Sequence, residues 1–270
     1  MKKYLLSIFS FSIFSFFSFL VVFPVQAQNF DFSKALQDYS YNYNLYRSNY
    51  IEYVAATGEY QRYQTLTSQT KALDLTKVML KSRDEALRTY LTALRLRLAE
   101  TPKVTSYQQN LSFTKLDAEI AWLSSHKDSL NSPGTLPDLI KVSDQLQQKY
   151  PGIELLSYQV LGTILTGREN DLRDQVKGST TDVEKMIEEK RNQGVNVDKL
   201  DRWLLEARNK ISLSEAKQAD AERTIQNIKV TAKNKSKVFN QAQFTYEESN
   251  QYLKESVTFL TEILNELKND

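Results

Sequence analysis

His126 is the only histidine of the chain, and histidine is the side chain that most often serves in acid–base catalysis and metal binding. It lies in the pentapeptide Ser124-Ser125-His126-Lys127-Asp128. Because the chain has no cysteine and one histidine, the usual zinc-binding sets cannot be assembled. A Ser-His-Asp triad is arithmetically possible, but the chain has no Gly-x-Ser-x-Gly turn to expose a nucleophile. The pattern therefore predicts that His126 is a surface residue near a helix end.

Paired carboxylates occur at Glu188-Glu189 and at Glu247-Glu248. Adjacent positions point to different sides of a helix, whereas acid–base catalysis requires two carboxylates that converge in a cleft. The Gly-x-Gly-x-x-Gly, phosphate-loop and calcium-loop patterns do not occur in the sequence. We therefore predict a protein that is not an enzyme, with no catalytic residue, no metal site and no cofactor.

Tyrosines at helical spacing are the most distinctive pattern of the chain. When the segment is divided into heptads, two positions of the repeat together form one stripe of nine residues. These are Phe32, Leu36, Tyr39, Tyr43, Tyr46, Tyr50, Tyr53, Thr57 and Tyr60. This 3-4 spacing places the nine residues on one face of a helix, as in the a/d seam of a coiled coil. One interpretation is a core stripe whose hydroxyls reach a wet rim, since a buried tyrosine hydroxyl needs a partner. The other is a docking surface, since tyrosine is enriched at interfaces. The candidate binding surface comprises Tyr39, Tyr43, Tyr46, Tyr50, Tyr53 and Tyr60.

The rest of the chain is typical of long amphipathic helices that would position this stripe. The 270 residues are 41% hydrophobic and 25% charged, with only seven Gly and five Pro. Leucines at heptad spacing run from Leu73 to Leu98 and are interrupted by Lys77 and Asp84. Further seams follow up to Leu267. We predict an all-α fold, an elongated antiparallel, coiled-coil-like bundle of long helices joined by short turns.

Several breaks divide this pattern. We predict that Tyr150-Pro151-Gly152 ends a helix and separates an N-terminal segment, 28–150, from a C-terminal segment, 151–270, which packs with it as two units or as one continuous bundle. Gly178-Ser179 predicts another break, and Thr181-x-x-Glu184 predicts a capping box that opens a new helix. The intervening stretch Ile153–Thr166 is strongly apolar but too short to span a membrane.

The N-terminus predicts export. Lys2 and Lys3 precede an apolar run up to Phe23, and Pro24-Val25-Gln26-Ala27 resembles a signal-peptidase site. We expect residues 1–27 to be a cleaved secretory signal and the protein to be secreted or periplasmic. The alternative is an uncleaved N-terminal membrane anchor, and only in that form do we expect membrane association.

Charge excludes nucleic acid as a partner. Without Lys2 and Lys3 the chain holds 33 basic residues against 33 acidic ones, a neutral balance that does not favour polyanions. The short basic cluster from Lys229 to Lys237 has acids before and after it, and its pattern predicts a solvated helix end or turn.

These features predict an exported, non-catalytic helical bundle with a structural or binding role at the cell envelope. Its expected partner is a protein or a glycan, and self-association is a further possibility. Two alternatives remain open at this point: a membrane-active, pore-forming-like bundle that uses Ile153–Thr166, and a helical hydrolase.

Overall fold

The computed structural model describes residues 29–269, which form six α-helices and no strand. The helices are α1 (Asn29–Tyr63), α2 (Leu66–Ala99), α3 (Ser106–Ser129), α4 (Leu136–Asn192), α5 (Asp198–Gln226) and α6 (Lys235–Asn269). The predicted all-α bundle is confirmed. The predicted signal segment lies outside the described residues.

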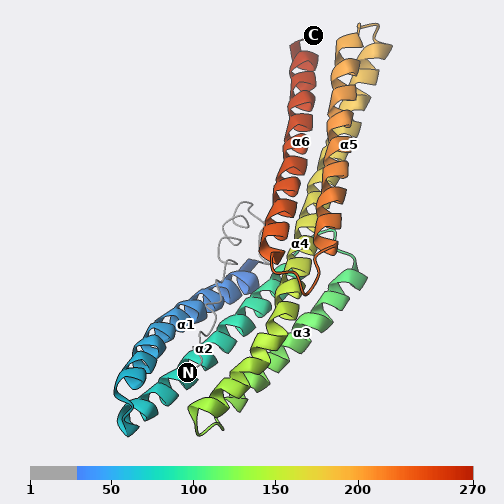
Figure 1. Ribbon diagram of the computed structural model, residues 1–270. Helices are drawn as coiled ribbons and strands as arrows, with labels where there is room; N and C mark the ends of the chain where they lie inside the picture. The colour runs from blue at the N-terminus through green and yellow to red at the C-terminus, as the bar shows by residue number, and fades with distance from the viewer. Residues whose placement is uncertain (1–28, 270) are drawn as a thin grey trace.

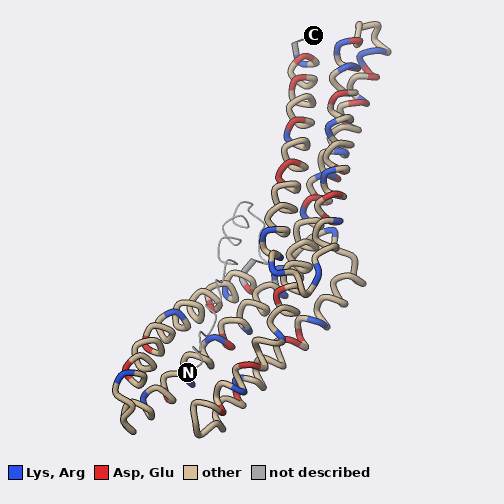
Figure 2. Tube along the Cα trace, viewed as in Figure 1, with Lys and Arg blue, Asp and Glu red and all other residues tan. Residues whose placement is uncertain are grey.

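The six helices form two arms that meet at an angle (Figure 1). One arm contains α1, α2, α3 and the first part of α4, and the other contains the rest of α4 with α5 and α6. Helix α4 has 57 residues and runs through both arms. Charges of both signs are interspersed along the two arms (Figure 2). Within residues 29–269, no helix has the length and apolar character needed to cross a membrane.

Side-chain caps fix where three of the helices begin. The Thr65 hydroxyl accepts from the Ser68 backbone N–H at the start of α2, and Thr105 does the same for Gln108 at the start of α3. At α4 the Thr135 side chain accepts from the Asp138 backbone N–H, and a proline occupies the first turn. Such caps pair backbone N–H groups that have no partner inside the helix. Because the caps satisfy these groups locally, each of these helices can begin directly after a short polar turn.

One core joins the two arms where they meet. All six helices contribute to it, with Tyr39 from α1, Leu94 from α2, Leu116 from α3, Ile164 from α4, Ile225 from α5 and Phe239 from α6. A second core lies along the arm of α4, α5 and α6. A third, at the far end of the other arm, contains Met79, Leu80, Leu130 and Leu139.

The predicted breaks within α4 are wrong. The helix continues through Pro151, Gly152 and Gly178, although an interior proline removes one backbone hydrogen bond. Packing outweighs this local cost, because the buried residues Ile153, Leu161 and Ile164 belong to the core shared by both arms. The boundary at 150/151 therefore falls inside a continuous helix. The predicted capping box at Thr181 is also wrong, since the Thr181 hydroxyl donates to the Lys177 carbonyl 3.1 Å away, within the helix.

Two glycines of α4 serve close approach between helices. A Cβ added at Gly167 would lie 2.5 Å from the carbonyl oxygen of Pro102 in the α2–α3 connection. A Cβ at Gly162 would lie 2.9 Å from the Ile225 side chain of α5. These positions let neighbouring elements come nearer than any other residue would permit. The glycines are thus packing residues at the junction of the arms, and neither ends the helix.

Candidate functional site

The tyrosine stripe lies on one face of α1, as its spacing predicts. Tyr39 is buried, whereas Tyr43, Tyr46, Tyr50, Tyr53 and Tyr60 are half-buried. The rings follow one another along the helix, with centroid separations of 6.0 Å for Tyr39–Tyr43, 6.3 Å for Tyr46–Tyr50 and 5.9 Å for Tyr50–Tyr53. Tyr39 also contacts Tyr90 of α2, at a centroid separation of 5.3 Å. The stripe is therefore a row of packed rings with one accessible edge.

The stripe closes against α2 and α4 and leaves little free space. The cavity at its centre is about 10 Å³, lined by Tyr43, Tyr46, Arg83, Ala86, Leu87, Leu146 and Tyr150. That volume holds about one water molecule. Burial raises the pKa of Tyr46, an effect that Tyr50 and Tyr43 reinforce and Arg83 opposes. Burial also raises the pKa of Tyr53. A ligand larger than one water molecule would therefore meet the half-buried edge of this stripe rather than enter this cavity.

The opposite side of α1 is accessible and exposes four large hydrophobic side chains among polar ones. Tyr41 and Ile51 are each 69% exposed, and Leu45 and Val54 are exposed as well. We call the solvent-facing side that these residues span the outward face of α1; Tyr41 and Ile51 lie toward its middle, and Leu45 and Val54, nine residues apart, lie at its opposite margins. Residues 39–58 carry only two charges, Arg47 and Glu52, although a solvent-facing helix side is ordinarily rich in charge. The helix packs mainly along α2 and lies at the edge of its arm (Figure 1). It is thus apolar on its packed side and largely uncharged on its open side.

The prediction that His126 is a surface residue is wrong. Its side chain is buried, with Nδ1 2.6 Å from Asp84 Oδ2 of α2 and Nε2 2.8 Å from the Val142 carbonyl of α4. A carbonyl oxygen only accepts hydrogen bonds, so Nε2 carries a proton, and Nδ1 donates to the carboxylate. Trp122 stacks on the imidazole at a centroid separation of 4.8 Å. His126 is therefore a buried imidazolium that links α3 to two other helices.

The electrostatics of this pair follow from its contacts. Burial opposes protonation of His126, but hydrogen bonds to Asp84 and to the Val142 carbonyl, together with the charge of Asp84, outweigh it and raise the pKa of the imidazole. Arg83 approaches Asp84 Oδ1 at 3.2 Å and Ser143 Oγ at 3.2 Å. Ser143 accepts from Arg83 and makes no bond to the imidazole, so the cluster has no activated nucleophile. Its arrangement is that of a buried ion pair which holds three helices together.

The sequence contained one signal for this pair. Asp84 interrupts the leucine seam of α2 and is fully buried, and a buried charge needs a partner. The only residue of the chain with a titration near neutrality is His126, which lies close to the seam of α3. The partnership itself depends on which helices are neighbours, and heptad spacing does not supply this. Among residues 29–269, no group of three His, Cys, Asp or Glu residues is placed to hold a metal ion.

Comparison of the chain with protein-family models, with curated proteins and with solved structures finds no match.

Proposed function

We propose that the protein is an exported, non-catalytic helical bundle that binds a protein partner at the cell envelope through the outward face of α1. One observation carries this proposal. The outward face exposes Tyr41, Leu45, Ile51 and Val54 on a stretch with only two charges. Aromatic residues with few Lys, Glu and Asp distinguish the centre of protein interfaces from the rest of a protein surface. The half-buried edge of the tyrosine stripe adjoins this face and extends it.

A protein suits this surface better than the other expected partners. Sugar-binding sites and small-molecule sites are concave, whereas this surface is the convex side of one helix. The membrane-active alternative would require the protein to give up part of its core. Ile153–Thr166 contributes Ile153, Leu161 and Ile164 to the core shared by all six helices, so its release for insertion would dismantle the junction of the arms.

The test uses the chain that begins at Gln28 and envelope fragments from the source organism. We expect the double variant Tyr41→Glu/Ile51→Glu to fold normally, because both side chains are 69% exposed. It should bind at least tenfold more weakly, a loss of about 1.4 kcal/mol or more. The matched control is Leu205→Glu/Phe244→Glu, at positions 58% and 65% exposed on the other arm.

The control should bind like the unmodified protein, and protease treatment of the fragments should abolish binding. Unchanged binding by Tyr41→Glu/Ile51→Glu would contradict the proposed surface. Binding that survives protease treatment but is lost on glycan digestion would contradict a protein partner.

A further inference from the structure

A second candidate site lies at the connection between α5 and α6, on the side of the molecule where the two arms meet. Residues 227–234 form this connection and border a cavity of about 430 Å³. The lining residues are Thr224, Asn227, Ile228, Lys229, Thr231, Ala232, Asn234 and Val238. Pockets for small molecules measure about 300–1,000 Å³. This cavity therefore has room for a small ligand, in contrast to the one-water space beside the tyrosine stripe.

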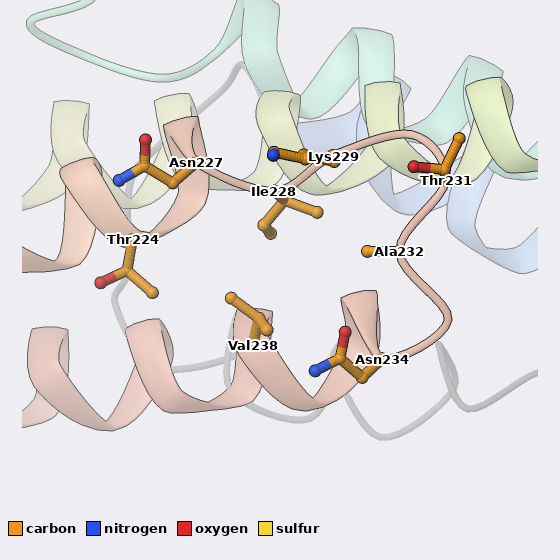
Figure 3. A pocket seen from close by; sticks show the side chains of 8 residues that line it. All are labelled: Thr224, Asn227, Ile228, Lys229, Thr231, Ala232, Asn234 and Val238. Atoms are coloured by element: carbon orange, nitrogen blue, oxygen red, sulfur yellow. The ribbon is translucent and has the colours of Figure 1, made fainter.

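The lining divides into an apolar floor and a polar rim. Ile228 of the connection and Val238 of α6 point toward each other across the pocket, with Thr224, Lys229 and Asn234 around them (Figure 3). Within residues 29–269, the side chains of Asn227, Lys229, Thr231 and Asn234 have no hydrogen-bond or ion-pair partner. The rim thus presents an amine, two amides and a hydroxyl whose donors remain available to a ligand.

The charge around this pocket is one-sided. Residues 223–246 contain Arg223, Lys229, Lys233, Lys235 and Lys237 and no acidic residue. Arg223 is paired with Asp220 at 3.4 Å, and two further acids, Glu222 beside it in the sequence and Glu154 opposite Lys235, also have partners. Glu222 accepts from the Thr166 hydroxyl at 3.0 Å and from the Gln218 amide at 2.7 Å, and Glu154 forms an ion pair of 2.9 Å with Lys235. The acids that flank the basic cluster in the sequence therefore leave Lys229 unneutralised in the structure.

We propose that this pocket binds a small phosphate ester, with the phosphate on the rim beside Lys229 and the carbon body on the floor of Ile228 and Val238. A phosphate offers several acceptor oxygens and up to two negative charges, which match several separate donors and one unpaired cation. Helix α6 starts at the pocket with no acid in its first turn, so its amino-terminal partial charge adds to the attraction. This site is separate from the outward face of α1 and is independent of any protein partner there.

The test measures binding to the folded protein by titration calorimetry. The first ligand is sn-glycerol 3-phosphate in solution. The second is phosphatidic acid in phosphatidylcholine vesicles, which presents the same phosphate group at a lipid surface, with pure phosphatidylcholine vesicles as the control. We expect at least one of these ligands to bind, and we expect binding to weaken with salt because the attraction is electrostatic.

Lys229→Gln should weaken this binding about tenfold, since it removes a charge-assisted hydrogen bond. Asn234→Ala should weaken it to a smaller extent. The matched control Lys254→Gln removes an equal charge from the exposed side of α6, away from the pocket, and should bind like the unmodified protein. Circular dichroism of each variant verifies the fold. The proposal would be overturned if neither glycerol 3-phosphate nor the phosphatidic acid vesicles bound, or if Lys229→Gln bound as well as the unmodified protein.

Discussion

Asp84 of α2 and His126 of α3 form a buried ion pair, with 2.6 Å between Asp84 Oδ2 and His126 Nδ1. The exposed fraction of each side chain is 1% or less. The second ring nitrogen of His126 binds the Val142 carbonyl of α4 at 2.8 Å. Three helices of one arm therefore meet at a single imidazole, and this geometry makes the arm sensitive to substitution and to pH.

Removal of one member of the pair should destabilise the protein strongly. We expect His126→Ala to lower the free energy of unfolding by about 3–5 kcal/mol, because Asp84 is then left as a buried charge without its main partner. The double variant Asp84→Leu/His126→Leu should lose less than either single leucine variant, since neither member of the pair is left without the other and Arg83 keeps its hydrogen bond to Ser143. Urea unfolding measures all of these. Lys185→Ala, in a pair whose side chains are 69% and 67% exposed, should cost less than about 1 kcal/mol.

The stability of the protein should fall as the pH rises above about 6.5. The folded state raises the pKa of His126 above its ordinary value of 6.5. The stabilisation by the charged imidazole is then fully present below about pH 6.5 and is lost as the pH rises through the raised folded-state pKa. His126 is the only histidine and the chain has no cysteine, so few other groups titrate in this range. The single histidine resonance gives the pKa directly by NMR. A pKa at or below 6.5 would contradict the ion pair.

Two glycines of the same helix should respond oppositely to alanine. Gly167→Ala places a Cβ 2.5 Å from the Pro102 carbonyl oxygen, which belongs to the backbone, and we expect a loss of about 1–3 kcal/mol from the overpacked contact. A Cβ at Gly178 meets no atom within 4 Å, so Gly178→Ala should stabilise the helix by about 0.5–1 kcal/mol. Thermal unfolding of both variants is the measurement. A stabilised Gly167→Ala would show that the arms do not approach each other there.

Heptad spacing predicted the elements that packing also favours. The tyrosine stripe forms one face of a continuous helix, and the seam leucines of α2 from Leu80 to Leu98 are buried as their 3-4 periodicity predicts. These predictions succeed because local pattern and tertiary burial agree. At Pro151 and Gly178 they disagree, and α4 continues because its buried residues Val176, Val183 and Ile187 follow one uninterrupted face. The free energy gained by burying these residues is not visible in the local sequence, so proline and glycine alone predict a break that does not occur.

The sites depend on neighbours that periodicity does not assign. His126 reads as a surface residue in isolation, and only the adjacency of α2, α3 and α4 brings Asp84 and Val142 to its ring. Heptad spacing placed the candidate binding surface on the stripe tyrosines and did not predict the outward face of α1, because Tyr41 lies off that stripe. The pocket at the α5–α6 connection could not be predicted from the sequence. Its shape depends on the backbone path of the connection, which has no repeating hydrophobic pattern.

Chemical footprinting of tyrosine tests the proposed partner surface most directly. Tyr41 on α1 is 69% exposed and Tyr107 on α3 is 77% exposed, so both should be iodinated readily in the free protein. With the protein bound to envelope fragments, we predict that Tyr41 becomes protected while Tyr107 keeps its reactivity. Equal labelling of Tyr41 in the free and bound protein would contradict a partner on the outward face of α1.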